Sequence, residues 1–313
     1  MATTTRPQNT QHNPRHYPST QQLRYLVALD DTRHFGQAAA RCFVSQSAFS
    51  IAIKALETLL DAHLVDRTNR SVTITPLGQD VVTQARLVLR DIDMLIDMAG
   101  AQHAPLCGKL HLGVIPTIAP FLIPRLLPAL RKAYPQLELY LKEDQTQNLY
   151  DALLKGELDV ILMAFPYPLS KVKTQILFQD HFRLAAHKNT RHINPERIAF
   201  NRLNRDSLLL LEDGHCMRDH ALNACKVRNL DSVNHFSATS LTTLVQMVDN
   251  DLGVTFLPDM AKGSGLLKHT KVKTYPLPDK AYREIGLAWR AGSGRDSEFA
   301  LLGEFIRQHH SGT

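Results

Sequence analysis

The chain has 313 residues, of which 44% are hydrophobic and 21% are charged, and its net charge is +6. This length predicts two or three domains, and the composition is that of a water-soluble globular protein. No apolar run is long enough to cross a membrane, and the N-terminus lacks the apolar core of a signal peptide. We therefore expect a cytoplasmic protein whose four cysteines are reduced, so that any disulfide is transient. The mildly basic charge suits a nucleic-acid partner and, equally, an enzyme.

Residues 1–19 are rich in Thr, Gln, Asn and Pro and predict a disordered tail. Helical periodicity begins in residues 21–29. A helix of small residues follows in residues 36–43, and Ser45 is a good N-cap for the next helix, over residues 47–60.

The segment of residues 64–75 reads as strand, turn and strand and carries two arginines, which is typical of a wing. Two helices joined by a tight turn and followed by a basic hairpin predict a mostly α winged helix-turn-helix domain over residues 20–75. Its second helix would enter the major groove of promoter DNA, where polar and basic side chains reach base edges and phosphates. We expect the DNA contacts to be Gln46, Ser47, Ser50, Lys54, Arg67 and Arg70.

Residues 76–105 predict a long linker helix and a hinge. Pro76 suits the first helical turn, Thr75 is the expected N-cap, and no proline follows between Leu77 and Ala101. An apolar stripe runs along this helix, and a small winged domain offers little surface to cover it. We therefore expect the helix to pair with a second subunit.

Residues 106–313 alternate between short strands and helices. The first three strands, at about residues 109–115, 137–141 and 158–163, follow the order of βαβ units, which predicts a parallel sheet. We interpret them as an α/β effector domain of two Rossmann-like lobes, similar to periplasmic binding proteins, with the chain crossing between the lobes twice. Lobe I comprises about residues 106–180 and 284–313, and lobe II about residues 181–283. Pro128 argues against a regular helix at its position. A ligand would bind in the cleft, where strands end and helices begin.

The segment from Leu211 to Cys225 contains two cysteines in a run with helical character. Nine residues of helix at ~1.5 Å each place Cys216 and Cys225 roughly 13 Å apart, whereas a disulfide needs Cα atoms within about 7 Å. The two could be bonded only if the helix unwound. The spacing alone favours two small buried hydrophobic residues over a redox pair.

The reactivity of Cys216 depends on its neighbours. A cysteine in the first turn of a helix feels the positive helix end, and His215 or Arg218 can add positive charge or a hydrogen bond, all of which favour the thiolate. Cys225 is the only second thiol nearby in sequence. His215, Cys216 and His220 form a weak zinc motif, because structural zinc sites usually have four closely paired ligands. We expect no metal and no cofactor.

Several motifs resemble the LysR-type family of transcriptional regulators. In the N-terminal part they are Ala38-Ala39, Val44-Ser45-Gln46-Ser47-Ala48-Phe49-Ser50, Leu64-Val65-Asp66-Arg67-Thr68 and Thr75-Pro76-Leu77-Gly78. Those that resemble its peroxide-sensing members are Ile115-Pro116-Thr117, Glu212-Asp213-Gly214-His215-Cys216-Met217-Arg218-Asp219 with Cys225, and His235-Phe236-Ser237-Ala238-Thr239. The resemblance extends from about Leu23 to Ile306. Ser47, Ala52 and Ala62 depart from it, since the family usually has proline, glutamine and glycine there.

The resemblance implies that hydrogen peroxide oxidises Cys216 to a sulfenic acid, which then forms a disulfide with Cys225. This switch would change how a homotetramer, a dimer of dimers, contacts promoter DNA and recruits RNA polymerase to antioxidant genes. The resemblance thus implies a regulator and not an enzyme. The polar residues that it places around the thiol are Thr117, Thr146, His215, Arg218, His235 and Arg283.

Two other functions stay open. A metabolite-responsive regulator of the same family would hold a small organic anion in the cleft, for example at Thr239 and Ser240, and its cysteines would be incidental. A thiol peroxidase would share the chemistry of Cys216 but leaves the DNA-binding module unexplained. A periplasmic solute-binding protein would explain the two lobes. It would not explain the DNA-binding module or the missing signal peptide.

Overall fold

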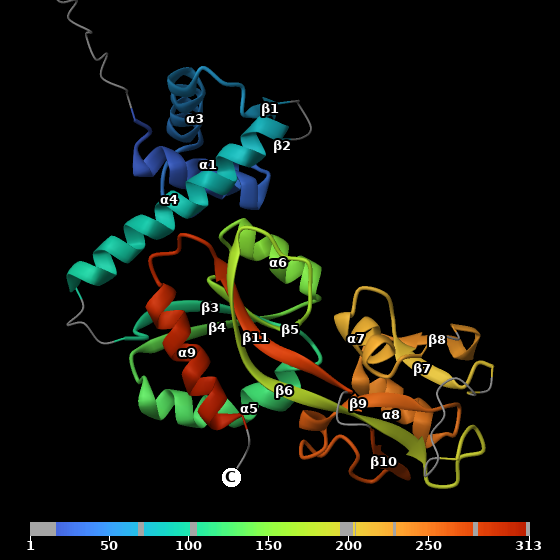
Figure 1. The fold of residues 1–313 in the computed structure, drawn as a ribbon. Helices are drawn as coiled ribbons and strands as arrows, with labels where there is room; N and C mark the ends of the chain where they lie inside the picture. Colours follow the sequence, from blue (N-terminus) through green and yellow to red (C-terminus); the bar gives the residue numbers. More distant parts are fainter. Residues whose placement is uncertain are drawn as a thin grey trace, which may run out of the picture. The chain divides into compact units, whose positions relative to one another are not determined.

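The computed structural model describes residues 17–67, 72–100, 105–194, 203, 205–227, 230–277 and 281–310. The chain divides between Leu95 and Ile96 into two compact units (Figure 1). Most of the predicted tail, residues 1–19, lies outside the described residues. Within them, no single helix is long and apolar enough to cross a membrane. One bent helix pair, residues 35–41 with 46–60 at 99°, meets the length and composition criteria only when the two are taken together.

The first unit is a winged helix-turn-helix domain, as predicted. Its elements are α1 (Thr20–Thr32), α2 (Phe35–Arg41), α3 (Gln46–Leu60), the wing strands β1 (Val65–Arg67) and β2 (Val72–Ile74), and α4 (Pro76–Gly100). Both predicted caps form, because Ser45 Oγ accepts from Ala48 N at 3.2 Å and Thr75 Oγ1 accepts from Gly78 N at 2.9 Å. A core that includes Leu26, Phe49 and Ile53 holds the three short helices together.

Two charged residues fix the wing and α4 to this domain. Glu57 Oε1 accepts from Leu64 N at 2.8 Å and from Val65 N at 3.1 Å, which anchors the start of the wing. Arg86 of α4 pairs with Asp30 and Asp31 of α1.

Beyond these contacts, α4 keeps apolar side chains in the open. Val88, Leu95 and Ile96 are exposed by 44%, 64% and 60%. An exposed apolar stripe of this kind is what pairing with a second subunit needs, and that pairing stays a prediction.

The second unit is a two-lobed α/β domain. Its helices are α5 (Ala119–Ala133), α6 (Thr146–Leu154), α7 (Cys216–Ala224), α8 (Leu241–Asp249) and α9 (Asp296–His309). Its strands are β3 (Gly108–Val114), β4 (Leu137–Glu143), β5 (Val160–Phe165), β6 (Val172–His187), β7 (Leu208–Leu211), β8 (Val233–Ala238), β9 (Thr255–Pro258), β10 (Val272–Pro276) and β11 (Tyr282–Arg290). The last of these strands and α9 return the chain to lobe I (Figure 1).

The predicted parallel pairing of the first three strands of this unit is confirmed, but the sheets as a whole are mixed. Strands β3, β4 and β5 pair in parallel, and so do β7 and β8. The path β10-β6-β11-β5-β3-β4 joins the lobes, however, and β6 is antiparallel to β9, β10 and β11. The two long strands β6 and β11 are the two crossings between lobes (Figure 1). The first half of β6 is largely exposed and shows no buried pattern, so sequence periodicity does not predict it.

Helix α5 corrects the expectation about Pro128, since it continues through Pro124 and Pro128. Pro120, Pro124 and Pro128 recur every four residues and are all exposed. Pro120 lies in the first turn, where an N–H has no partner within the helix, but Pro124 and Pro128 each remove the N–H that would donate to the carbonyl four residues earlier. Because these positions face solvent, water can hydrogen-bond to the carbonyls left unpaired. On the opposite face of the helix, buried side chains such as Leu122 and Leu126 pack into the core.

Each lobe has its own hydrophobic core. The lobe I core includes Leu112, Ile161 and Ile285, and the lobe II core includes Leu184, Leu209 and Val245. Cys216 packs in the lobe I core although α7 lies within the lobe II part of the sequence. The first turn of α7 therefore lies between the lobes.

Candidate functional site

The helix α7 begins at Cys216 and ends at Ala224, with His215 as N-cap and Cys225 as C-cap. The predicted helical character of this segment is confirmed. Gly214, just before it, has φ +96°, a conformation that favours glycine. A Cβ on Gly214 would lie 2.6 Å from Gln145 Oε1, so the turn before α7 fits closely against the residue that precedes α6.

The two cysteines of α7 are free thiols that point into different cores. Cys216 is buried in the lobe I core and Cys225 in the lobe II core. Nine helical residues separate them by roughly 13 Å along the axis, which is about twice the Cα separation that a disulfide tolerates. A bond between them therefore requires α7 to unwind.

Burial dominates the ionisation of both thiols. It raises the pKa of Cys216, while the Thr146 hydroxyl and the Arg283 guanidinium lower that pKa and Asp219 raises it. Burial alone raises the pKa of Cys225 to about 12. A backbone hydrogen bond and the charge of Arg283 lower the pKa of Cys216, but desolvation outweighs both, so the net shift is upward.

A buried polar network centred on Arg283 lies beside Cys216. Arg283 Nε donates to Asp180 Oδ2 at 3.0 Å, Nη1 donates to Thr117 Oγ1 at 2.7 Å, and Nη2 donates to the Thr117 carbonyl at 3.0 Å. Asp180 is also buried, which raises its pKa, and Arg283 opposes this effect. Because Thr117 Oγ1 accepts from the guanidinium, its own hydroxyl proton is left to donate elsewhere.

Thr146, the first residue of α6, faces the thiol from lobe I. Its Oγ1 atom is buried and makes no well-aligned hydrogen bond to any described residue. The same hydroxyl lowers the pKa of Cys216, which places it beside the sulfur. The structure therefore brings three predicted residues, Thr117, Thr146 and Arg283, together around Cys216. We call these four residues and His220 the Cys216 site.

Three other predicted residues lie elsewhere or act differently. The side chain of His235 is 89% exposed and lies 3.7 Å from Asp206, because β8 turns it toward solvent. Arg218 forms an ion pair with Asp213. His215 is buried as the N-cap residue, and burial lowers its pKa, so it adds no positive charge near neutral pH.

Sequence reasoning missed three residues near the thiol. The sequence suggests only a weak zinc-ligand role for His220. In the structure, its Nε2 atom lies 2.8 Å from the Pro166 carbonyl of lobe I. Its spacing of four residues from Cys216 was the available signal. Tyr167 carries a pKa raised by burial and by Cys216, and it donates to Gln147 Oε1 at 2.8 Å. Asp180 gave no signal, because its partner Arg283 is distant in sequence.

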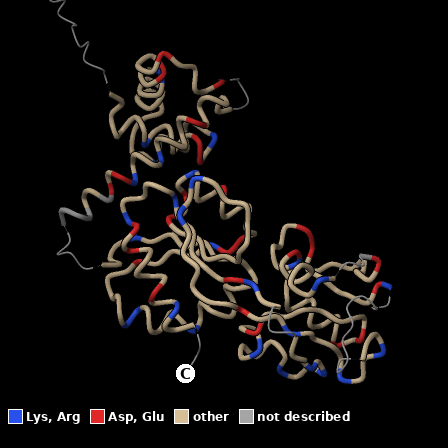
Figure 2. The backbone as a smooth tube through the Cα atoms, in the orientation of Figure 1, with Lys and Arg blue, Asp and Glu red and all other residues tan. Residues whose placement is uncertain are grey.

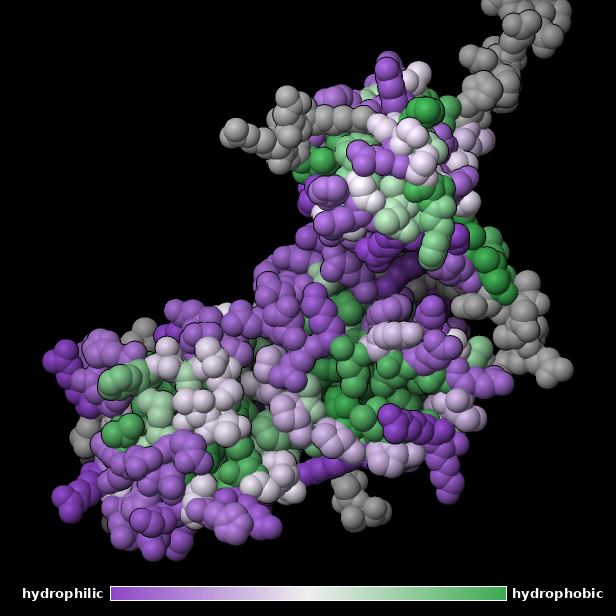
Figure 3. All heavy atoms as spheres, turned by 180° about the vertical axis from the view of Figure 1, so that it is seen from behind, coloured by the Kyte–Doolittle hydropathy of each residue, from purple (hydrophilic) through white to green (hydrophobic). Residues whose placement is uncertain are grey.

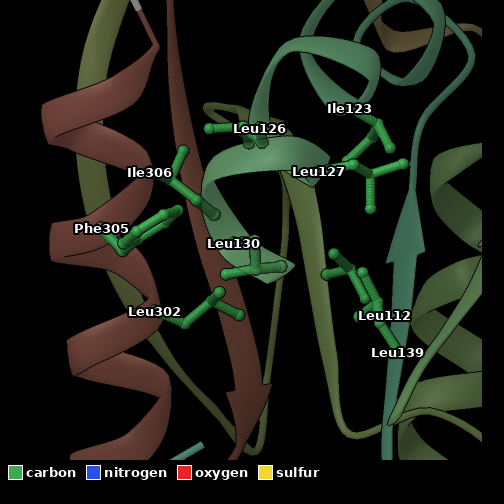
Figure 4. Close-up of a pocket in the computed structure, with 9 residues that line it drawn as sticks. All are labelled: Leu112, Ile123, Leu126, Leu127, Leu130, Leu139, Leu302, Phe305 and Ile306. Atoms are coloured by element: carbon green, nitrogen blue, oxygen red, sulfur yellow. The ribbon is translucent and has the colours of Figure 1, made fainter. Parts of the chain in front are cut away.

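No grouping of three or more His, Cys, Asp or Glu side chains suited to a metal occurs within the described ranges, so nothing supports the zinc motif. A pocket in lobe I, between α5, α9 and the sheet, offers no polar group either (Figure 4). It is lined by Leu112, Ile123, Leu126, Leu127, Leu130, Leu139, Leu302, Phe305 and Ile306. Such a lining has no polar group that could orient a polar ligand.

The candidate DNA surface is the exposed side of α3. Gln46, Ser47 and Lys54 are exposed and Ser50 is half-buried, whereas Phe49 and Ile53 point into the domain core. Arg67 lies in β1, and its side chain is outside the described part, as is the whole of Arg70. Figure 2 shows basic and acidic residues interspersed along the described backbone of the first unit.

Comparison with known proteins settles the family. The description "Bacterial regulatory helix-turn-helix protein, lysR family" matches residues 20–79, and "LysR substrate binding domain" matches residues 103–311. The chain belongs to the LysR family. The resemblance inferred from its motifs is confirmed, as is the predicted fold class.

Individual LysR-family relatives cover nearly the whole chain. The HTH-type transcriptional regulator EstR from Acinetobacter baylyi is 38% identical over 93% of this chain and 97% of its own length. The hydrogen peroxide-inducible genes activator from Dickeya chrysanthemi is 39% identical over 92% of this chain and 94% of its own. A full-length OxyR variant from Pseudomonas aeruginosa superimposes with a TM-score of 0.78 at 34% identity, covering 95% and 99% of the two chains. The chain is thus a LysR-family regulator closely similar to OxyR.

Proposed function

We propose that this LysR-family chain is a peroxide-sensing transcriptional activator whose sensor is Cys216. The observation that carries the proposal is the placement of two free thiols on one helix, with Cys216 in the lobe I core and Cys225 in the lobe II core. A change in the bonding of either sulfur must alter how α7 joins the lobes. Relatives named hydrogen peroxide-inducible activators support the signal.

The chemistry begins with attack of the Cys216 sulfur on one oxygen of hydrogen peroxide. An S–O bond forms, the O–O bond breaks, and the departing hydroxide takes up the thiol proton to leave as water. Thr117 and Thr146 supply hydroxyls that can both donate to and accept from a peroxide molecule. The sulfur of Cys225 then displaces hydroxide from the sulfenic acid, so that an S–S bond forms and a second water leaves.

Formation of the disulfide converts oxidation of Cys216 into a change in the structure of α7. Since α7 keeps the two sulfurs apart, bond formation unwinds it and withdraws Cys216 from the lobe I core. We infer that this rearranges a homotetramer, formed as a dimer of dimers, on promoter DNA and recruits RNA polymerase. The exposed apolar stripe of α4 and the apolar side chains that gather over lobe I in Figure 3 supply surfaces for subunit contacts.

The protein is proposed to act as a regulator and not as a turnover enzyme, because the relatives are transcriptional regulators. A metabolite-responsive regulator is the second candidate, and the similarity to EstR, whose name does not refer to peroxide, favours it. The two candidates differ in what triggers the DNA response: oxidation for the first and a small organic ligand for the second.

A promoter-reporter assay with Cys216→Ser and Cys225→Ser tests the proposal. We expect Cys216→Ser to abolish the peroxide response, while Cys107→Ser, at a free and half-buried cysteine of the same unit, responds normally. Mass spectrometry of the treated wild-type protein should detect a peptide linked through Cys216 and Cys225. A full peroxide response from Cys216→Ser would refute the sensor. Absence of the linked peptide would remove the disulfide step.

A further inference from the structure

His220 has one ring nitrogen bonded and the other buried without a partner. Nε2 lies 2.8 Å from the Pro166 carbonyl, which can only accept, so Nε2 carries the hydrogen and donates it. In the neutral ring this leaves a lone pair on Nδ1. Nδ1 is buried and has no hydrogen-bond partner among the described residues. The residue as a whole is more than nine-tenths buried. Buried acceptors are rarely left unused, so this atom needs an explanation.

The position of His220 points to Cys216 as the group it serves. The two residues are four apart on α7, so they share one face of the helix with Cβ atoms about 5–6 Å apart. Both face lobe I, because Cys216 packs in its core and His220 donates to Pro166. The hydroxyl of Thr146, whose Oγ1 atom is also buried, lies beside the same sulfur.

The charged groups around His220 keep it neutral. Burial lowers the pKa of His220, Arg283 of β11 lowers it further, and Asp219 of α7 raises it. Among the other titratable groups, Asp180 of β6 is committed to Arg283, and the hydroxyl of Tyr167, after β5, donates to Gln147. A neutral imidazole with a free lone pair can accept a proton, whereas Arg283 can only donate.

We propose that Nδ1 of His220 accepts the proton of the Cys216 thiol when the sulfur attacks peroxide, an inference that rests on the proposed sensing function. The thiol proton passes to Nδ1 as the S–O bond forms and the O–O bond breaks. The imidazolium then returns this proton to the departing hydroxide, which leaves as water. The sum is one thiol and one hydrogen peroxide giving one sulfenic acid and one water, with sulfur oxidised and peroxide reduced.

A base is needed because the thiol does not ionise readily by itself. Burial raises the pKa of Cys216, so the thiolate is scarce at neutral pH unless a neighbour takes the proton. Arg218 is bound to Asp213, and His235 is turned to solvent. His215 is also buried and neutral, but it lies before the first turn of α7, whereas His220 lies four residues after Cys216 on the same face of the helix.

The test is the rate of Cys216 oxidation by hydrogen peroxide in the full-length protein, measured by stopped flow between pH 5 and pH 8. In the His220→Gln variant, the glutamine amide can still donate a hydrogen bond to the Pro166 carbonyl, but it cannot accept a proton from the thiol. We expect its rate at pH 7 to fall by about 10²-fold, the lower end of general-base contributions. The wild-type rate should be level near neutral pH and fall in acid as Nδ1 is protonated. The His220→Gln rate should instead rise about tenfold per pH unit throughout.

The matched control is His192→Gln, because His192 Nε2 also lies 2.8 Å from a backbone carbonyl, that of Asp251, in lobe II. We expect it to leave rate and pH profile unchanged. A His220→Gln protein with the wild-type rate and profile overturns the inference while the sensor survives. If that variant does not fold, a wild-type profile without an acid limb overturns it equally. Wild-type Cys216 reacting no faster than free cysteine would refute the sensing function itself.

Discussion

Arg283 donates to Thr117 Oγ1 at 2.7 Å, and this hydrogen bond joins β11 to the loop after β3 across 166 residues of sequence. The guanidinium is completely buried and also pairs with Asp180 at 3.0 Å. It orients Thr117 and at the same time lowers the pKa of Cys216. One side chain therefore links the crossing strands, the lobe I loop and the sensor thiol.

Replacement of Arg283 by Ala should lower the free energy of unfolding by about 3–5 kcal/mol, because it leaves the Asp180 carboxylate buried without its partner. Urea denaturation measures this loss. Arg205→Ala, at a side chain that is 82% exposed, is the control and should change stability by no more than about 0.5 kcal/mol. Asp180→Asn added to Arg283→Ala should recover part of the loss, and a purely additive double variant would contradict the pairing.

Thr146→Val keeps the shape of the side chain and removes the hydroxyl. We expect Cys216 to react with peroxide about tenfold more slowly, since the hydroxyl that lowers the thiol pKa is gone. Stability should not fall, because Thr146 Oγ1 makes no well-aligned hydrogen bond within the described residues. Thr255→Val is the contrast: Thr255 Oγ1 donates to the Leu209 carbonyl at 2.7 Å, and its loss should destabilise by about 1 kcal/mol without slowing oxidation.

Gly214→Ala tests the fit between the turn before α7 and lobe I. The added Cβ meets Gln145 Oε1 at 2.6 Å and also strains a φ of +96°. Gly292 has a similar φ of +84° with nothing within 4 Å, so Gly292→Ala reports the backbone strain alone. The strain should lower the free energy of unfolding of each variant by about 1 kcal/mol. Gly214→Ala should in addition alter the peroxide reactivity of Cys216. Equal effects of both variants on stability and reactivity would argue against a functional contact.

The buried Cys225 thiol should make stability depend on pH in alkaline solution. In the unfolded chain a thiol ionises near pH ~8.5, whereas burial raises the folded pKa of Cys225 to about 12. The unfolded state therefore releases its proton first. Below about pH 8.5 this thiol makes its full contribution to the free energy of unfolding. As the pH rises toward the folded pKa, that contribution falls by roughly 1.4 kcal/mol per pH unit. Comparison of wild type with Cys225→Ala by urea denaturation from pH 8 to pH 10 isolates this slope, which should be shallower in the variant.

Lys54→Ala tests the α3 surface. Lys54 is exposed on this helix, and loss of a phosphate contact should weaken binding to all DNA sequences and reduce the salt slope of log K by about 1. Fluorescence anisotropy over a salt series measures both quantities. Lys262→Ala, an exposed lysine of the second unit, serves as control. A Lys54→Ala protein with an unchanged slope would place the contact elsewhere.

Local features of this protein could be predicted because neighbouring residues determine them. Ser45 and Thr75 cap their helices since a side-chain oxygen three residues before a backbone N–H is within reach in any helical start. The α7 helix was predictable from its composition, and with it the separation of Cys216 from Cys225. The order of helices and strands likewise indicated a winged domain followed by an α/β domain.

Contacts between distant segments were decided only by the tertiary structure. Asp180 and Arg283 are 103 residues apart and meet because β6 and β11 pair antiparallel, a register that no local periodicity reveals. His235 faces solvent and His220 faces lobe I, a difference that their positions near motif residues do not reveal. Burial likewise depends on packing: the sequence placed Cys216 at a helix start, where the dipole favours the thiolate, but only the lobe I core supplies the desolvation that raises its pKa.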